Sequence, residues 1–510
     1  MRSRTDLPDL PRRRFLISTG ALLGLGALGG LTTPGRAIAG ETPHWRPAVR
    51  FAPERNWIND PNGLVFFDGE YHLFCQHNPS GDQWGNMSWL HAVSTDLVRW
   101  QELPVALEPD ELGAIFSGSA VVDHHDTSGF FGGKPGLVAL YTSAGDSQQQ
   151  SLAHSSDRGR TWTKYDGNPV IPNPGIADFR DPKVFWHEPT GRWVLLLAAG
   201  DRIQIYGSPN LRDWEQLSEF GAERGAHGGV WECPDLFELP VDGDPARTRW
   251  VMIVSINPGG PAGGSATQYF IGDFDGTTFT AEGPADEVRW ADRGADFYAP
   301  QSFSDVPDGR RLWLGWTSNW DYAAAIPTSP WRGMMSTPRE LGLTDAAGGV
   351  QLVQRPVAEL SDVRANRRAW GGVLTDGSDV EFRGSAVDVV ATFRLGTAPV
   401  VGVDVFAGPG GRTRVGYDVA AGELFVDRTD SGEAQVSQQF PARHGTPLAV
   451  DGGVLALRVV ADRSCVEVFA QDGRAVLTDL VFPDSGSDRI APFAAGGRAE
   501  AELEVFDLTP

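Results

Sequence analysis

Four segments of this chain repeat one local pattern, a turn rich in Ser, Asp or Asn that leads to an aromatic residue. They are residues 94–100 (STDLVRW), 155–162 (SSDRGRTW), 208–214 (SPNLRDW) and, more loosely, 273–279 (DFDGTTF). Their first residues lie 61, 53 and 65 positions apart. A repeat of about this length, with roughly four short strands between successive copies, is what one blade of a β-propeller requires.

The intervals between these turns read as short strands. Apolar or alternating runs recur between turn signals, for example at 64–67 (LVFF), 71–74 (YHLF), 120–122 (AVV) and 137–141 (LVALY). Asp68-Gly69 between the first two predicts a tight hairpin. We therefore expect an all-β fold in which residues 45–355 form a five-bladed β-propeller, with a β-sandwich or an irregular β protein as the alternative.

The motifs and turn residues of the sequence change after residue 356. Short strands such as 400–406 (VVGVDVF) and 465–469 (CVEVF) alternate with Gly and Asp turns, and the Trp-rich motifs end at Trp370. This pattern predicts a second domain over residues 365–510, most simply a C-terminal β-sandwich. Its expected role is to pack against the propeller, and the alternative is an auxiliary sugar-binding module.

Residues 1–39 have the pattern of an export signal. Arg12-Arg13-Arg14 precedes an apolar run from residue 17 to about 31, and 37–39 (AIA) follows. This arrangement predicts a twin-arginine signal peptide and a secreted protein. A membrane-anchoring helix is the alternative, but the apolar run of about 15 residues is shorter than the ~20 that span a bilayer.

Charge and cysteine content limit the classes of partner and cofactor that this chain is expected to bind. The formal net charge of −23 and the pI near 4.8 speak against a nucleic acid or, after signal removal, a membrane surface as partner. Three cysteines form no disulfide framework, and no Cys-x-x-Cys or His-Glu-x-x-His spacing predicts a zinc site. We expect no metal and no cofactor. A monomer and a homodimer both stay open.

Three carboxylate clusters next to proline are the candidate chemistry. They are 57–63 (WINDPNG), 180–182 (RDP) and 232–235 (ECPD). Asp60 and Asp181 are separated by 121 residues, about two repeats, and Asp181 and Glu232 by 51, about one. Each cluster would thus occupy the equivalent place on the innermost strand of a different blade, facing the central funnel.

Convergent carboxyls suit the hydrolysis of a glycosidic bond with retention, which needs a nucleophile and a proton donor about 5–5.5 Å apart. Glu232 has the longer reach, and we expect a largely apolar wall beside Trp231 to favour its protonated form. Asp60, expected in a polar Asn-rich loop, would stay ionised as nucleophile. Asp181 would hold substrate hydroxyls and support a developing positive charge, and it need not form a salt bridge with Arg180, because adjacent strand residues face opposite sides.

Taken in order, the motifs 57–63, 116–119 (FSGS), 179–183 (FRDPK) and 232–235 resemble those of glycoside hydrolase family 32, the invertase, inulinase and levanase group. The resemblance covers residues 45–510. It implies a five-bladed propeller followed by a β-sandwich and a retaining mechanism without a metal. By motif, Asp60 resembles the nucleophile, Glu232 the acid/base catalyst and Asp181 the stabiliser of the transition state.

The resemblance also implies a pocket for a terminal fructosyl unit. Its expected substrate-binding residues are Asn59, Gln76, Trp84, Ser117, Arg180 and Trp320. Trp320 could equally be a core residue. Motifs at 258–261 (PGGP), 272–274 (GDF), 296–299 (DFYA) and 318–320 (SNW) are similar to levanases and exo-inulinases more than to plain invertases.

The predicted function is release of fructose from levan or inulin, with cleavage of sucrose. One alternative keeps the same site but transfers the fructosyl group to a sugar, as a levan fructotransferase does. A second alternative is a propeller lectin that binds fructans without cutting them. The sequence does not determine whether levan or inulin is the preferred substrate. It also does not determine whether the enzyme attacks within a chain or at its end.

Overall fold

The computed structural model describes residues 44–432 and 436–509. The predicted signal at 1–39 lies outside this part of the chain. The described residues form a five-bladed β-propeller followed by a β-sandwich, so the predicted fold class is confirmed. Helix is limited there to short 3-10 turns: η1 (Glu188–Thr190), η2 (Pro307–Gly309), η3 (Ala323–Ala325), η4 (Ala358–Val363) and η5 (Asp451–Gly453).

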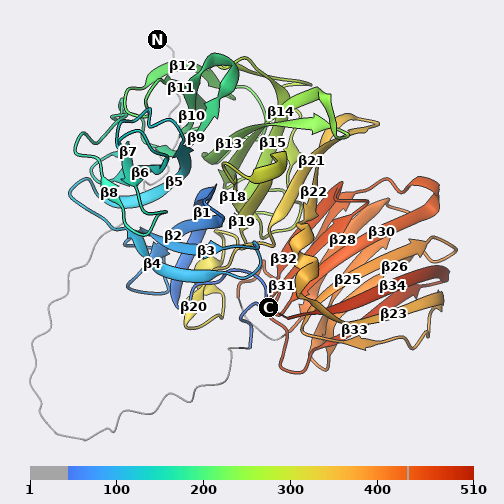
Figure 1. The fold of residues 1–510 in the computed structure, drawn as a ribbon. Helices are drawn as coiled ribbons and strands as arrows, with labels where there is room; N and C mark the ends of the chain where they lie inside the picture. The colour runs from blue at the N-terminus through green and yellow to red at the C-terminus, as the bar shows by residue number, and fades with distance from the viewer. Residues whose placement is uncertain (1–43, 433–435, 510) are drawn as a thin grey trace, which may run out of the picture. The chain divides into compact units, whose positions relative to one another are not determined.

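Each of the first three blades is a four-stranded antiparallel sheet with its strands in chain order (Figure 1). Blade I holds β1 (Asn56–Phe67), β2 (Glu70–Asn78), β3 (Ser88–Ser94) and β4 (Gln101–Leu107). Blade II holds β5 (Ala114–Asp123), β6 (Gly136–Ala144), β7 (Gln148–Ser155) and β8 (Thr163–Lys164). Blade III holds β9 (Phe179–His187), β10 (Arg192–Ala199), β11 (Ile203–Ser208) and β12 (Glu215–Phe220).

The last two blades are joined edge to edge by one residue pair, Val241 with Leu343. Blade IV holds β13 (Val230–Val241), β14 (Asp244–Asn257), β15 (Ala266–Phe274) and β16 (Phe279–Ala281), with β17 (Arg289–Trp290) beside β15. Blade V holds β18 (Tyr298–Ser302), β19 (Leu312–Trp316), β21 (Arg339–Ala346) and β22 (Gly349–Pro356). A short strand, β20 (Trp331–Arg332), crosses to pair with β1.

The innermost strands close a ring. Strands β1, β5, β9 and β13 each pack against the next in this order, and β18 packs against both β13 and β1. Residues distant in sequence therefore meet at the centre of the ring. The strands of this ring belong to different blades and do not pair with one another, so its lining is built by side chains rather than by backbone pairing.

The repeated sequence turns occupy one place in four blades, between the third and fourth strands. In the first copy, Asp96 Oδ1 accepts the backbone N–H groups of Val98 and Arg99, and Trp100 Nε1 donates to the carbonyl of Leu97. The copy at 208–214 repeats these contacts. Because a short polar side chain satisfies the backbone of its own turn, this element is encoded locally. The predicted hairpin at Asp68-Gly69 is also present, with both residues at positive φ.

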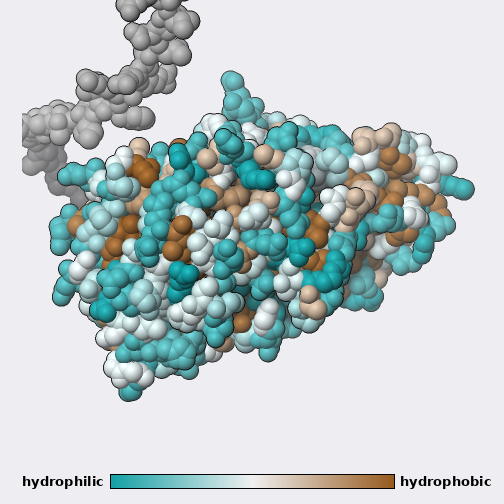
Figure 2. All heavy atoms as spheres, turned by 90° about the horizontal axis from the view of Figure 1, so that it is seen from above, coloured by the Kyte–Doolittle hydropathy of each residue, from teal (hydrophilic) through white to brown (hydrophobic). Residues whose placement is uncertain are grey.

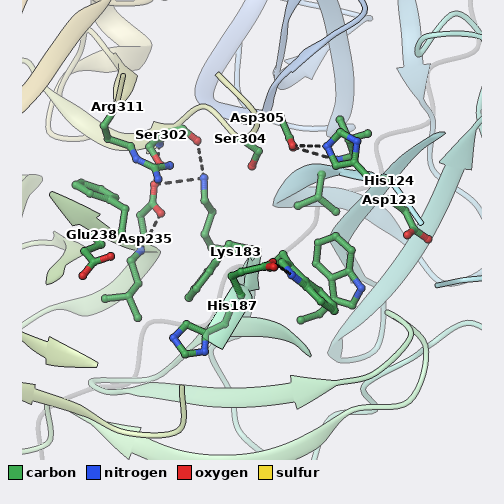
Figure 3. A pocket seen from close by; sticks show the side chains of 18 of the residues that line it. Asp123, His124, Lys183, His187, Asp235, Glu238, Ser302, Ser304, Asp305 and Arg311 are labelled. Atoms are coloured by element: carbon green, nitrogen blue, oxygen red, sulfur yellow. Dashed lines mark hydrogen bonds and ion pairs between the residues drawn. The ribbon is translucent and has the colours of Figure 1, made fainter. Parts of the chain in front are cut away.

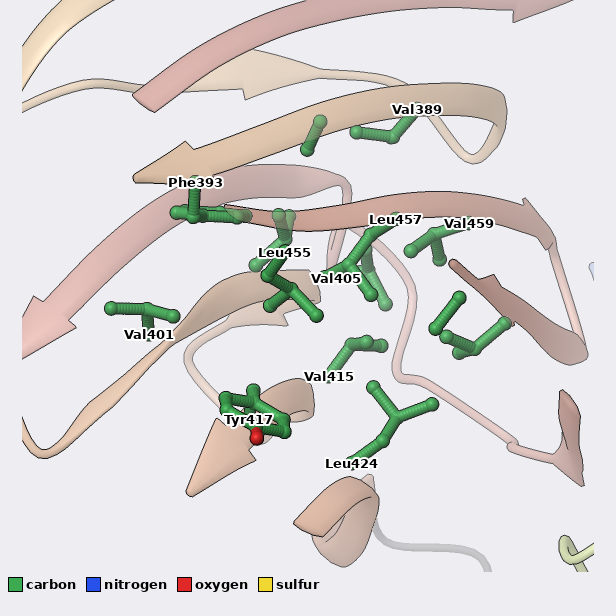
Figure 4. Close-up of a cluster of buried hydrophobic side chains, with 14 of the residues drawn as sticks. Val389, Phe393, Val401, Val405, Val415, Tyr417, Leu424, Leu455, Leu457 and Val459 are labelled. Atoms are coloured by element: carbon green, nitrogen blue, oxygen red, sulfur yellow. The ribbon is translucent and has the colours of Figure 1, made fainter. Parts of the chain in front are cut away.

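The C-terminal domain is a sandwich of two six-stranded sheets. One sheet has the order β23 (Arg364–Thr375), β34 (Arg498–Leu508), β25 (Ala386–Arg394), β30 (Val454–Asp462), β31 (Cys465–Ala470) and β32 (Ala475–Leu480). The other has the order β24 (Phe382–Arg383), β33 (Arg489–Ala495), β26 (Val400–Gly408), β27 (Gly411–Asp418), β28 (Glu423–Ser431) and β29 (Arg443–Pro447). Figure 4 shows the aliphatic layer between them, in which Val389 and Leu457 lie opposite Val405 and Val415.

Buried ion pairs connect the sandwich to the propeller. Glu467 of β31 accepts hydrogen bonds from Arg339 of β21 at 2.7 Å and from Arg50, which precedes β1, also at 2.7 Å. Arg428 of β28 pairs with Asp296 of the propeller at 2.7 Å. All these side chains are buried, so each charge depends on its partner for compensation.

The surface of the described residues is mostly polar. Figure 2 shows hydrophilic residues over most of one face, with hydrophobic residues in small scattered groups. The large hydrophobic side chains that are exposed are Trp84, Val373 and Val419. No helix within the described ranges is long and apolar enough to cross a membrane.

Candidate active site

One end of the ring of inner strands holds a cavity of about 360 Å³. All nine site residues predicted from the sequence line it: Asn59, Asp60, Gln76, Trp84, Ser117, Arg180, Asp181, Glu232 and Trp320. Phe116, Gln148, Asp178 and Asn257, which the sequence reasoning did not select, line it as well. The structure therefore brings the predicted residues together, while their chemical roles stay predictions.

Asp60 lies in strand β1, and its placement in a loop was wrong. The segment pairs with β2, but the register shifts between Ile58 and Pro61 and again between Asn62 and Val65. A strand with such irregularities can aim a side chain away from regular alternation. Gly63 allows the second one, since it has φ of +55° and a Cβ atom there would lie 2.6 Å from the Phe74 ring.

The other two clusters also belong to strands with local distortions. Asp181 in β9 has φ of +67°, and Cys233 in β13 has φ of +45°. These values are unusual for residues other than glycine, and such residues concentrate at functional sites. In β13 the register shifts between Glu232 and Asp235, so Glu232 and Asp235 line different cavities.

Hydrogen bonds join Asp60 and Asp181 through a shared cysteine. Ser117 Oγ donates to Asp60 Oδ2 at 2.8 Å, and the backbone N–H of Cys233 donates to Asp181 Oδ2 at 3.0 Å. The Cys233 thiol lies 3.7 Å from Asp60 Oδ2 and 3.6 Å from Asp181 Oδ2. Burial raises the pKa of this thiol well above its ordinary value, so it remains a protonated donor to both carboxyls.

Glu232 faces polar groups, which corrects the apolar wall expected from its neighbours in sequence. Its Oε1 accepts hydrogen bonds from Arg180 Nη2 at 2.9 Å and Nε at 3.2 Å, and its Oε2 accepts one from the hydroxyl of Tyr298. Arg180 also comes within 3.9 Å of Asp181, although adjacent strand residues were expected to face opposite sides. The positive φ of Asp181 breaks the strand alternation on which that expectation depended.

Burial makes ionisation costly for both aspartates. It raises the pKa of Asp60 above the ordinary value, and the charge of Glu232 raises it further, whereas hydrogen bonds from Asn59 and Ser117 oppose the rise. Burial likewise raises the pKa of Asp181 to about 7, against the lowering effect of Arg180. Asp181 is therefore partly protonated near neutral pH.

Tyr298 is the main functional residue that the sequence reasoning missed. It begins β18 in blade V, is buried, and donates to Glu232 across 66 positions of sequence. Its pKa is raised well above the ordinary value, first by burial and then by Glu232, so it remains a neutral donor. The motif at 296–299 was noticed, and its tyrosine was the available signal.

The rim of the pocket carries indole rings. Trp84 is 52% exposed and its ring is perpendicular to that of Phe116. Trp320 is partly buried and stacks on Trp57 with ring centres 5.9 Å apart. Trp57 in turn donates to Asn59 Oδ1 at 2.8 Å. Aromatic faces beside amide and carboxyl groups are suited to binding a sugar ring.

Within residues 44–432 and 436–509, no group of three or more His, Cys, Asp or Glu side chains could hold a metal ion. The three cysteines are free and buried.

Comparison with known proteins gives two family matches that together span most of the chain. The N-terminal domain of glycosyl hydrolases family 32 matches residues 50–356, and the C-terminal domain of the same family matches residues 359–509. Among curated relatives, a levanase from Bacillus subtilis (strain 168) is 53% identical over 464 residues, which cover 89% of this chain and 68% of that protein.

A levanase from Bacillus sp. (strain L7) is 41% identical over 494 residues, covering 92% of this chain. This chain spans about half of that relative's length, 52%. Among solved structures, the exo-inulinase from Aspergillus awamori superposes with a TM-score of 0.86 at 39% identity. The match covers 91% of this chain and 98% of that one.

Proposed function

The chain belongs to glycosyl hydrolase family 32 and is a glycoside hydrolase, and from that premise we propose that it releases fructose from the ends of levan or inulin chains and also cleaves sucrose. The observation that carries the proposal is the convergence of Asp60, Asp181 and Glu232, from blades I, III and IV, in one small cavity. The names of its relatives, levanase and exo-inulinase, support the substrate class.

In the proposed mechanism, Asp60 attacks the anomeric carbon of the terminal fructosyl unit and Glu232 protonates the leaving oxygen. Glu232 then removes a proton from the water that hydrolyses the fructosyl-enzyme, which gives net retention. Ser117 and Cys233 hold one oxygen of Asp60 by hydrogen bonds. Oδ1 of Asp60 is buried and accepts no hydrogen bond from the described residues within ordinary limits, although Asn59 lies near enough to lower the pKa.

Asp181 would bind the fructosyl hydroxyls and stabilise positive charge as it develops at the anomeric carbon. Arg180 is held in place by Asp178 at 2.6 Å and by Gln148 at 3.2 Å. It would keep Glu232 oriented until the substrate arrives. The cavity of about 360 Å³ lies near the lower end of the usual range for small-molecule sites, which supports attack at chain ends.

We also propose that residues 1–39 direct export through the twin-arginine route, since Arg12, Arg13 and the apolar run that follows have the required pattern. Replacing both arginines by lysine should retain the protein inside the cell. Unchanged appearance in the medium would contradict this route.

The central test is to identify the first products from levan, inulin and sucrose. Free fructose should appear from the outset, and proton NMR should show the β-anomer before mutarotation. Cyclic difructose or longer oligosaccharides in place of fructose would overturn the proposal and favour the fructotransferase alternative.

The roles of the two catalytic carboxyls can be separated by isosteric variants. Asp60→Asn should lower kcat by at least about 10⁴-fold on every substrate, because it removes the nucleophile. Glu232→Gln should impair substrates with poor leaving groups most, because they depend on protonation. Asp213→Asn, at an exposed turn of blade III, is the matched control and should keep normal rates. Full activity in either active-site variant would exclude the mechanism.

A further inference from the structure

A second and larger cavity, of about 700 Å³, lies among the same inner strands but shares no lining residue with the candidate active site. Figure 3 shows it from close by, with Lys183, Asp235 and Arg311 on one side and His124 with Asp305 on another. Its volume falls within the range of about 300–1,000 Å³ that is usual for small-molecule sites. Nothing in the proposed reaction uses it.

The inner strands contribute to both cavities in turn. On β9, Asp181 lines the active site and Lys183 lines the second cavity, and on β13 the corresponding pair is Glu232 and Asp235. Buried hydrogen bonds fill the space between them. Ser119 Oγ donates to the carbonyl of Pro182 at 2.9 Å and accepts the backbone N–H of Val184. A molecule bound in one cavity therefore does not reach the other.

Aromatic rings supply part of the second cavity's wall. Phe185, Trp186 and Trp250 line it and are partly exposed. The ring of Trp193 supports Trp186 edge-on, with centres 5.2 Å apart, and Phe274 supports Trp250 at the same distance. These rings are held rigidly by the core, so they offer preformed apolar faces to the C–H groups of a ligand.

Polar groups with spare hydrogen-bonding capacity lie beside these rings. Lys183 is buried, and its Nζ donates to the carbonyl of Ser302 at 2.6 Å and pairs with Asp235 at 3.3 Å, which leaves one of its three N–H donors. Arg311 makes long bonds of 3.3 and 3.4 Å through Nη1. Glu238 is exposed and adds an acceptor carboxylate.

The charged side chains that line the second cavity limit the class of ligand that it could bind. Five carboxylates line the cavity, those of Asp123, Glu188, Asp235, Glu238 and Asp305, against the permanent cations Lys183 and Arg311. An anion would face this excess of negative charge. A bound metal ion is disfavoured as well, because no cluster of metal-ligating side chains occurs in the described residues. The rigid rings beside hydrogen-bond donors and acceptors fit a molecule with an apolar face and several hydroxyl groups, which is the chemistry of a sugar.

We propose that this second cavity is a carbohydrate-binding site, separate from the active site, that takes a neutral mono- or disaccharide. The proposal depends on the proposed function only in the choice of fructose and sucrose as probes. Binding there would hold a product or a chain end on the enzyme without cleaving it.

Equilibrium dialysis of radiolabelled fructose against the wild-type protein tests the proposal. Two fructose molecules should bind per chain, one in each cavity. Ser304→Trp would place an indole ring in the second cavity and block part of it, because Ser304 lines the cavity and its backbone is fixed by hydrogen bonds to Leu64 and Phe66. This variant should bind one fructose per chain and hydrolyse sucrose with a kcat/KM within about twofold of wild type.

Ser156→Trp, at an exposed position in the 155–162 turn, is the matched control and should still bind two. Glu238→Ala gives an independent decision if Ser304→Trp fails to fold. It should weaken the second site about tenfold, because a hydrogen bond to a charged group is lost.

Three results would overturn the proposal: one fructose per chain in the wild type, unchanged binding in both cavity variants, or displacement of the second fructose by inorganic phosphate. The last result would identify the ligand as an anion. If sucrose and fructans are not hydrolysed at all, the proposed function fails, while the dialysis stoichiometry still decides the second site.

Discussion

Replacing Asp181 by asparagine should make the protein more stable at alkaline pH while it removes activity. Asp181 is buried, and its pKa rises from 3.8 to about 7 in the folded protein, mainly because burial penalises the charge. In the unfolded chain the carboxyl has already lost its proton at pH 5. Ionisation of Asp181 therefore opposes folding, and this cost grows as the pH rises through 7.

The size of the effect follows from this pKa. A rise from 3.8 to about 7 corresponds to about 4 kcal/mol of unfolding free energy above pH 7, at about 1.4 kcal/mol for each pH unit. About 3 kcal/mol of this develops between pH 5 and pH 8. Asparagine has no charge to bury, and its amide oxygen can still accept the backbone N–H of Cys233, which now bonds Asp181 at 3.0 Å. The advantage of Asp181→Asn over wild type should grow by that amount.

Urea unfolding followed by tryptophan fluorescence, at pH 5 and at pH 8, measures this difference. The exposed carboxylate variant Asp213→Asn is the control and should shift unfolding by less than about 0.5 kcal/mol at both pH values. Activity of Asp181→Asn on sucrose should fall at least about 100-fold. A stability gain of equal size at both pH values, or a loss at pH 8, would refute the reasoning that burial of this charge is costly.

Three further changes test other parts of the structure. Tyr298→Phe should lower kcat about tenfold with little change in KM, because Glu232 loses a hydrogen-bond donor. The control, Tyr206→Phe in blade III, should leave kcat unchanged. Equal rates in the two variants would contradict a role for the Tyr298 hydroxyl. Glu467→Gln should cost about 2–4 kcal/mol at pH 7 by calorimetry, because two buried arginines each lose one of two carboxylate partners and keep the other, Asp462 for Arg50 and Asp292 for Arg339. The pKa of Glu467 is lowered to about 2, so the stability that its charge contributes is present above pH 4.5 and is lost as the pH falls through 2. A melting temperature of Glu467→Gln equal to that of wild type at pH 7 would contradict this contribution. Trp84→Ala should leave stability unchanged and raise KM for fructans about fivefold, since Trp84 is 52% exposed at the rim, and an unaltered KM would remove it from the binding site.

Local sequence was sufficient for the repeating elements. The turn at 94–100 forms because Asp96 and Trp100 bond to the backbone of their own turn, and the same chemistry recurs in blade III. Such contacts span three residues or fewer, so the pattern could be recognised along the chain. The motifs around Asp60, Asp181 and Glu232 likewise identified residues that do meet in one cavity.

The sequence by itself determined the all-β architecture, the two-domain order and nine of the residues that line the pocket, because periodic strands, turn residues and motifs are written in short segments. Only the tertiary structure decided which groups surround each carboxyl. Glu232 is bound by Arg180, 52 positions away, and by Tyr298, 66 positions away, instead of by its neighbours Trp231 and Cys233. The physical reason is that closure of five blades sets contacts between strands of different blades, and distorted strands there no longer follow the simple alternation of faces.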